Sequence, residues 1–282
     1  MFWIPTLIFL GISALLCSVG FKKFVYFLSI GYGFAVAGLG ISYSIYSFIN
    51  NSWDIIGLVF SLLLVVYGAR LSVFLIAREV KSLSYRRVLN EVTDNGQKKI
   101  PFFVLLCIWI SCSLLYFAQT CPVFYRGANI AGNMDLLLRF SNFSSINWNS
   151  LICPIIGIFF SLFGLIIESL ADAQKTAQKK INPNMVATKQ LYKFVRCPNY
   201  FGEILFWTGI FVGGCQAYNH WGQWLVAILG YICIVYVMIN SAQRLAKKQE
   251  TRYGDKEEYR EYADNPSLLI PFISFSHIRK KK

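Results

Sequence analysis

Long apolar stretches recur along this chain of 282 residues. The hydrocarbon core of a bilayer is about 30 Å thick, and an α-helix needs about 20 apolar residues to cross it. Seven stretches fit that requirement, although the sixth is short and Gly-rich. The sequence therefore predicts an all-α fold, a polytopic integral membrane bundle of seven transmembrane helices. The expected spans are Phe2–Gly20, Phe24–Ile49, Ile55–Ala77, Pro101–Ala118, Leu151–Leu170, Phe201–Ala217 and Trp221–Ile239.

The composition supports a membrane location. Charged residues make up 15% of the chain, against about 25% in ordinary soluble domains. Aromatic residues reach 17%, which lipid-facing surface can absorb. The first stretch resembles a signal-peptide core, but it has no basic start and no convincing cleavage site, so we expect it to be a retained span. No linker or internal repeat divides the chain, and we expect a single membrane domain over residues 1–282.

The net charge of +13 has an explanation in membrane topology. Of the 27 basic residues, all but Arg70, Arg126 and Arg139 fall on one side of the seven-span arrangement. By the positive-inside rule this side is cytoplasmic, so the C-terminus lies in the cytoplasm and the N-terminus outside or in the lumen. We expect no nucleic-acid partner. The membrane is the inner membrane in a bacterium and the endoplasmic reticulum in a eukaryote.

Cysteine and histidine usage gives no sign of a metal site. The eight Cys residues form no Cys-x-x-Cys pair, and the chain has two His residues. The glycine-rich signatures of soluble nucleotide-binding domains are also missing from the sequence.

Charged residues in or beside the spans are functional candidates, because a bilayer makes them costly. Tyr67 and Arg70 share a face of the third span, and Arg78 follows. Arg70 is either a snorkelling side chain or a cation that faces an internal cavity. In the second case Tyr67 is a candidate proton donor.

A second set of charges continues from the fifth span. Glu168, Asp172, Lys175 and Lys179 are spaced by four, three and four residues, so they form one stripe on a helix. The acids and bases either pair with one another or form a polar wall that binds a ribose and phosphate.

A third set opens the sixth span, in the run from Arg196 to Glu203. Pro198 suits the first turn of a helix, and a helix start beside an Arg is an anion site. Asn199 and Glu203 share one face, and a Glu at the start of an apolar helix requires a partner. After the last span come Arg244, a Tyr-rich run with Tyr253, and an apolar end at residues 268–272 that we expect to dock on the bundle.

These residues resemble a known family. Residues 198–203 read Pro-Asn-Tyr-Phe-Gly-Glu, which resembles a signature of the membrane steroid 5α-reductase superfamily, including bacterial members of unassigned function. The other sets occur in the matching order, over residues 55 to 273. The resemblance implies seven membrane helices and NADPH-dependent reduction of a carbon–carbon double bond conjugated to a ketone, in a steroid, sterol or related lipid taken from the bilayer. We expect the protein to be a monomer.

The resemblance also implies roles for individual residues. Tyr67 matches the position that hydrogen-bonds the substrate carbonyl, with Arg70 beside it. The cofactor-binding region covers about residues 151–273. The implied cofactor contacts are Arg78, Glu168, Asp172, Lys179, Arg196, Asn199, Tyr200, Glu203, Arg244 and Tyr253.

The chain departs from the family on the second span. A Gln-Glu pair that helps to bind the ketone in mammalian steroid enzymes has no counterpart in Phe24–Ile49, where Tyr43 and Tyr46 are the substrate-binding candidates. This argues against steroid 3-ketones. Two other functions compete: an isoprenylcysteine-type methyltransferase that uses S-adenosylmethionine, which the C-terminal half also resembles, and a non-catalytic lipid-binding membrane protein.

Overall fold

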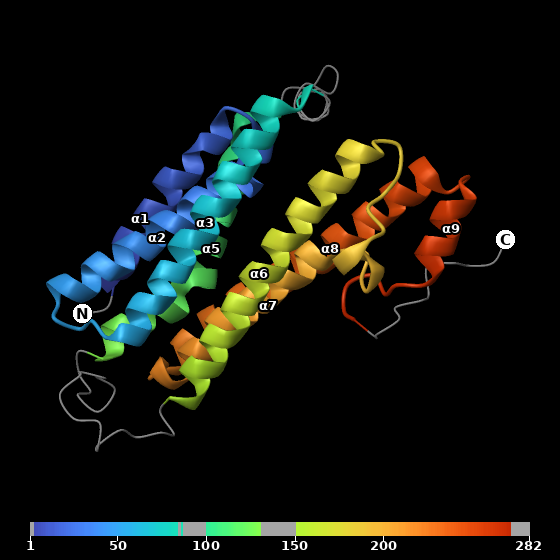
Figure 1. The fold of residues 1–282 in the computed structure, drawn as a ribbon. Helices are drawn as coiled ribbons and strands as arrows, with labels where there is room; N and C mark the ends of the chain where they lie inside the picture. Colours follow the sequence, from blue (N-terminus) through green and yellow to red (C-terminus); the bar gives the residue numbers. More distant parts are fainter. Residues whose placement is uncertain (1–2, 84–85, 87–99, 131–150, 272–282) are drawn as a thin grey trace. The chain divides into compact units, whose positions relative to one another are not determined.

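A computed structural model describes residues 3–83, 86, 100–130 and 151–271. The regular structure in these ranges is helical (Figure 1), which confirms the all-α prediction. Short 3-10 turns, including η1 (Ser18–Phe21), η2 (Phe24–Leu28) and η6 (Gln190–Lys193), join some of the helices. The α-helices are α1 (Trp3–Cys17), α2 (Ile30–Ile49), α3 (Ile55–Lys81), α5 (Phe102–Ile130), α6 (Ile152–Ile181), α7 (Pro198–Gly214), α8 (Trp221–Tyr253) and α9 (Glu257–Asp264).

Six stretches within the described ranges are long and apolar enough to cross a membrane, with mean hydropathies from 1.3 to 2.2. They contain α1, α2, α3, α5, α6 and α8. Large apolar side chains remain exposed on them, among them Trp3, Phe103 and Ile232, as lipid-facing surface requires. The chain therefore has the helices of a multi-pass membrane protein. The remaining predicted span corresponds to α7, whose 17 residues give a length of about 26 Å.

Several helices continue beyond the apolar stretches that predicted them. α6 extends to Ile181 and α8 to Tyr253, because their polar continuations contain no Pro or Gly to end a helix. α5 runs through Pro122 to Ile130. Arg126, which the sequence suggested lies in an outer loop, is instead a helical residue and 2% exposed.

The buried Arg126 has a specific partner. Its Nε donates to Oδ2 of Asp54 at 3.0 Å, and Nη2 makes a second hydrogen bond to the same oxygen. Asp54 precedes α3 and accepts from the backbone N–H of Gly57 at 2.9 Å. One carboxylate thus caps α3 and neutralises a guanidinium of α5.

The chain divides into two compact units. The first comprises residues 1–158 and 210–231, and the second comprises residues 159–209 and 232–282. In the first unit α2 packs closely on α3, since a Cβ added to Gly68 would meet the carbonyl oxygen of Gly33 at 2.3 Å. The organisation as one membrane domain remains a prediction.

The second unit contains the C-terminal segment, whose docking confirms the expectation for residues 268–270. Ser267 forms a parallel bridge with Val195. Leu269 is buried against Cys197 and Ala242, and neighbouring apolar residues pack around them. Residue 272 lies outside the described ranges. The tail therefore covers the residues immediately before α7.

Candidate functional site

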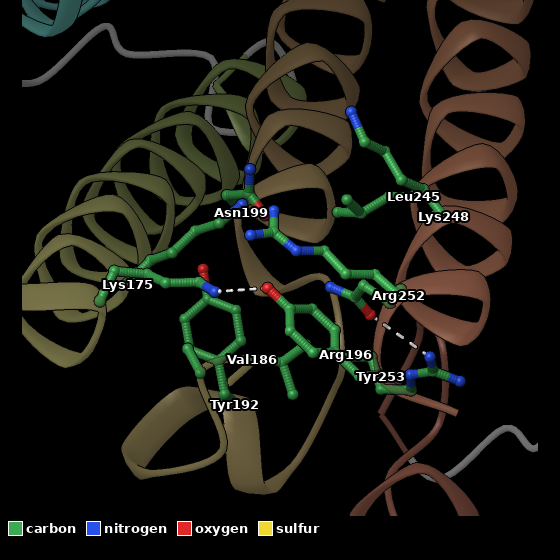
Figure 2. A pocket seen from close by; sticks show the side chains of 12 residues that line it. Lys175, Val186, Tyr192, Arg196, Asn199, Leu245, Lys248, Arg252 and Tyr253 are labelled. Carbon is green, nitrogen blue, oxygen red and sulfur yellow. Dashed lines mark hydrogen bonds between the residues drawn. The ribbon is translucent and has the colours of Figure 1, made fainter. Parts of the chain in front are cut away.

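A pocket opens within the second unit (Figure 2), and residues of α6, α7, α8 and the connection from α6 to α7 line it. Its volume is about 160 Å³, less than the roughly 300–1,000 Å³ of pockets that enclose whole small molecules. It has room for part of a large ligand. The lining residues are Lys175, Lys179, Val186, Ala187, Tyr192, Arg196, Asn199, Leu245, Lys248, Gln249, Arg252 and Tyr253.

Charge is the main property of this pocket. Its lining includes Lys175, Lys179, Arg196, Lys248 and Arg252, and none of the described residues that line it is acidic. Cations that converge on one space attract anions, and both Lys and Arg bind phosphate groups in proteins. The pocket is therefore suited to an anionic ligand.

The predicted stripe on α6 supplies two of the cations, since Lys175 and Lys179 lie one turn apart on the same helix. Lys179 Nζ donates to the Tyr253 hydroxyl at 3.0 Å and lies 5.1 Å from the centre of that ring. Arg252 lies 5.3 Å from the same ring centre. Tyr253 thus holds cations of α6 and α8 beside one another.

The connection after α6 is held by two glutamines of that helix. Gln178 Oε1 accepts from the backbone N–H groups of Thr188 and Lys189, at 2.9 and 3.0 Å. Gln174 Oε1 accepts from the N–H of Leu191 at 3.1 Å. These bonds fix the segment that carries the pocket residues Val186, Ala187 and Tyr192.

Arg196 and Asn199 contribute polar atoms that have no partner within the structure. The Nε of Arg196 and the Oδ1 of Asn199 are both buried and make no hydrogen bond to any residue that the structure describes. Buried polar atoms of folded proteins are nearly always paired. Two unpaired atoms from neighbouring residues of one pocket therefore indicate a place where a ligand or water completes the hydrogen bonding.

The helix start that carries these residues is as predicted. α7 begins at Pro198. In the segment before it, the N–H groups of Arg196 and Cys197 donate to the carbonyls of Ser267 and Leu268, at 2.9 and 3.1 Å. Burial raises the pKa of the Cys197 thiol to about 11, although Lys175 and Arg196 act in the opposite direction.

Glu168 of α6 and Glu203 of α7 are both buried. A Cβ added to Gly202 would lie 2.7 Å from the backbone nitrogen of Glu168, and one added to Gly164 would lie 2.4 Å from that of Phe206. The two helices therefore pack backbone to backbone. Neither glutamate is among the pocket-lining residues.

The other predicted cofactor contacts of the second unit also lie outside the pocket lining. Asp172 is half-buried on α6, and Tyr200 packs against the cluster around Cys197. Arg244 is exposed on α8 and donates to Ser241 at 3.1 Å. The structure thus brings together Lys179, Arg196, Asn199 and Tyr253 of the predicted set, and the roles of all of them remain predictions.

The predicted substrate residues belong to the first unit. Tyr67 is fully buried, and its hydroxyl lies 3.3 Å from that of Tyr32. Arg70 and the predicted cofactor contact Arg78 flank the ring of Phe74, each at 5.9 Å from its centre. Tyr67 and Tyr32 are thus neighbouring phenols in an apolar core. The sequence did not predict that Tyr32 lies beside Tyr67.

Tyr43 and Tyr46 lie elsewhere on α2, in an aromatic cluster. Tyr43 is buried and its hydroxyl lies 2.8 Å from that of Thr120. Both tyrosine rings contact Phe9 and Phe124. These contacts give both residues a packing role, and substrate binding by them remains a prediction.

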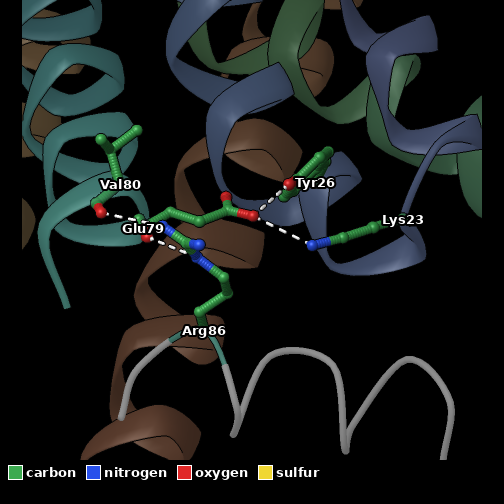
Figure 3. Close-up of polar contacts among 5 residues, drawn as sticks. All are labelled: Lys23, Tyr26, Glu79, Val80 and Arg86. Carbon is green, nitrogen blue, oxygen red and sulfur yellow. Dashed lines mark hydrogen bonds and ion pairs between the residues drawn. The ribbon is translucent and has the colours of Figure 1, made fainter. Parts of the chain in front are cut away.

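The sequence also did not predict a polar network at the end of α3 (Figure 3). Glu79 Oε1 accepts from Lys23 Nζ at 3.0 Å and from the Tyr26 hydroxyl at 2.6 Å. Arg86 donates to the carbonyls of Glu79 and Val80, at 3.2 and 2.8 Å. The hydrogen bond to Glu79 raises the pKa of Lys23. The network ties the turn before α2 to the last turn of α3.

Three pocket residues of α8 were not predicted, because their sequence resembles the solvent-exposed end of a helix. Lys248, Gln249 and Arg252 lie in a charged run after the last apolar stretch. Their spacing with Leu245 and Tyr253 is that of one helix face, which is the signal that identifies them.

Comparison with known proteins places the chain in a family. The family model described as "Protein of unknown function (DUF1295)" matches residues 30–266. This protein belongs to that family. The match covers α2 to α9, and so includes every residue of the pocket.

The chain is also similar to the uncharacterized protein C7D4.09c of Schizosaccharomyces pombe. The two are 30% identical over 118 residues, which are 42% of this chain and 38% of the yeast protein. The matched region thus spans well under half of the relative. No solved structure matches this chain.

Proposed function

We propose that this protein is an NADPH-dependent membrane reductase of the steroid 5α-reductase superfamily. Its substrate is a steroid, sterol or related lipid from the bilayer with a carbon–carbon double bond conjugated to a ketone. The proposal joins the Pro-Asn-Tyr-Phe-Gly-Glu run at residues 198–203 to the pocket beside it. We also propose that α7 is the seventh span. The basic residues concentrated in the loops of one side are the reason for proposing a cytoplasmic C-terminus.

The observation that carries the proposal is the basic pocket with its two unpartnered atoms. NADPH bears a diphosphate and a further phosphate, so its binding requires several cations close together. Five basic residues line the pocket, and Arg196 Nε and Asn199 Oδ1 offer a donor and an acceptor. The residues present thus fit the phosphate-bearing part of the cofactor.

The pocket size agrees with a partial site. A volume of about 160 Å³ suits one part of a dinucleotide, the rest of which requires other surfaces of the protein. Lys175, Lys179, Arg196, Lys248 and Arg252 would hold phosphate. Asn199, at the start of α7, would accept from a ribose hydroxyl or an amide.

The chemistry divides between cofactor and chain. NADPH, when bound, supplies a hydride. Negative charge then develops on the ketone oxygen of the substrate, and a hydrogen-bond donor stabilises it. Tyr67 is the proposed donor, and its burial keeps water away from such a reaction. This role rests on the resemblance.

The pocket charge favours the reductase over the methyltransferase. S-adenosylmethionine carries a sulfonium cation and a single carboxylate, so five nearby cations offer it little. A non-catalytic lipid-binding protein would use these cations only if its lipid had an anionic headgroup.

Binding measurements on the detergent-purified protein test the proposal. We expect saturable binding of NADPH, with little binding of S-adenosylmethionine, and weaker NADPH binding after Arg196→Gln or Asn199→Ala. Lys180→Gln is a matched control, because Lys180 is an exposed cation of α6 outside the pocket lining. Binding of S-adenosylmethionine without NADPH would establish the methyltransferase instead. Binding of neither would support the non-catalytic alternative.

A further inference from the structure

Tyr259 of α9 contacts residues that line the pocket. It is fully buried, although α9 itself is a short and highly charged helix. Its hydroxyl accepts from Arg196 Nη2 at 2.8 Å, and its ring centre lies 5.8 Å from the guanidinium carbon. Tyr259 is not among the lining residues of the pocket. Its hydroxyl therefore acts on the pocket through Arg196, while its ring packs against other lining residues.

The contacts of Arg196 divide its guanidinium into two parts. Nη2 is fully engaged, since it donates to Tyr259 and to Gln249 Oε1 at 3.3 Å. Nε is buried and has no partner among the described residues. A guanidinium is planar, so fixing one nitrogen and the plane of the group fixes the direction of the others. The bonds at Nη2 thus determine where the unpaired Nε–H points.

The surroundings of Tyr259 make it a rigid support. Its ring packs with Met185, Val186 and Tyr253, of which the last two line the pocket. Farther along α9, the Tyr262 hydroxyl donates to the backbone carbonyl of Tyr192 at 2.9 Å. The helix is thus attached to the lining at several points.

We infer that Tyr259 is a positioning residue for anion binding, which orients the Arg196 guanidinium so that its Nε–H meets a phosphate oxygen in the pocket. A flexible Arg loses side-chain entropy when it binds a ligand, and that loss weakens binding. An Arg already held by Tyr259 and Gln249 has lost that freedom on folding. The inference rests on the proposed function for the identity of the ligand, NADPH, and on the geometry alone for the role of Tyr259.

A double-mutant cycle on the full-length purified protein tests this role, with NADPH and inorganic pyrophosphate as separate probes. Tyr259→Phe removes the acceptor and keeps the ring. We expect it to weaken binding about tenfold, the effect of one hydrogen bond to a charged group. It should have little further effect in the Arg196→Gln background, because Tyr259 acts through Arg196. Tyr236→Phe, at an exposed residue of α8, is the matched control.

The thermal midpoint without ligand separates positioning from packing. We expect Tyr259→Phe to leave that midpoint nearly unchanged. If it drops, Gln249→Ala provides a second cycle, because it removes the other acceptor of Nη2. Since Gln249 also lines the pocket, its coupling to Arg196 is the readout rather than its effect alone. If the losses of binding from Tyr259→Phe and Arg196→Gln are additive, the inference is overturned. Where Gln249→Ala replaces Tyr259→Phe, additive losses with Arg196→Gln overturn it in the same way.

The two probes distinguish this inference from the proposed function. Binding of NADPH that Tyr259→Phe leaves unchanged overturns the positioning role and leaves the reductase standing. Binding of pyrophosphate without NADPH overturns the reductase, and the cycle measured with pyrophosphate then decides the role of Tyr259. If neither probe binds the wild-type protein, both proposals are wrong.

Discussion

Gly202 and Glu168 belong to two helices whose backbones nearly touch. A Cβ at Gly202 would lie 2.7 Å from the backbone nitrogen of Glu168 and at the same distance from the carbonyl oxygen of Gly164. Because both neighbours are backbone atoms, they cannot rotate away. The contact sets the separation of α6 and α7, and therefore the placement of Lys175 and Asn199 across the pocket.

We expect Gly202→Ala to lower the thermal midpoint of the purified protein. The added methyl group overpacks the contact, which typically costs about 1–3 kcal/mol. Gly222→Ala is the matched control, because a Cβ there meets nothing within 4 Å. Equal midpoints for the two variants would show that α6 and α7 can separate without cost.

The ion pair of Arg126 with Asp54 predicts strong coupling in the first unit. We expect Arg126→Gln alone to cost about 3–5 kcal/mol, because it leaves Asp54 buried without its counter-charge. Asp54→Asn should also destabilise, although the amide oxygen can still cap α3. The double variant should lose less than the sum of the single losses, as measured by thermal unfolding. Additive losses would contradict the pairing.

The Cys197 thiol should resist alkylation well into the alkaline range. Burial raises its pKa to about 11, while an unfolded Cys ionises near 8.5. Only the thiolate reacts, so labelling by iodoacetamide should stay slow up to about pH 10. Between these two pKa values the unfolded chain loses a proton that the folded chain keeps, so the stability of the fold should fall as the pH rises through this window.

Mass spectrometry of the labelled peptide measures this reactivity, with Cys197→Ser as the blank and denatured protein as the reference for full reaction. Rapid labelling of the folded protein at pH 7 would show that the tail does not cover Cys197.

Lys248 and its neighbour Lys247 form a matched pair on α8. Both are exposed, but Lys248 lines the pocket and Lys247 does not. We expect Lys248→Gln to weaken NADPH binding roughly two- to fivefold at low salt, the range of exposed charge interactions. The effect should shrink at high salt. Lys247→Gln should leave the dissociation constant unchanged, and equal effects would assign the attraction to overall charge.

Tyr67→Phe tests the proposed donor. We expect it to slow the reduction of an enone lipid about a hundredfold, the scale of a lost acid–base group. NADPH affinity should be nearly intact, because Tyr67 does not line the basic pocket. Stopped-flow oxidation of bound NADPH measures the rate, and equilibrium binding measures the affinity. A collapse of NADPH affinity would show that Tyr67 is misassigned.

The sequence predicted what depends on local pattern. Apolar length located the long helices, Pro198 marked the start of α7, and helical spacing joined Lys175 to Lys179. It could not predict contacts that depend on tertiary packing. Arg126 looked like a loop residue because its partner Asp54 is far away in the sequence. Hydropathy also reports only the part of a helix at bilayer depth, so Lys248 and Arg252 fell beyond the expected end of the last span.

The pairing of Ser267 with Val195 has a consequence for biosynthesis. The N–H groups of Arg196 and Cys197 find their acceptors in residues 267 and 268, which the ribosome adds after every long helix of the chain. During translation, Arg196 is therefore made before its backbone partner and before Tyr259. The basic pocket is thus among the last features to assemble, and a chain stalled before residue 267 would insert its helices yet lack a complete pocket.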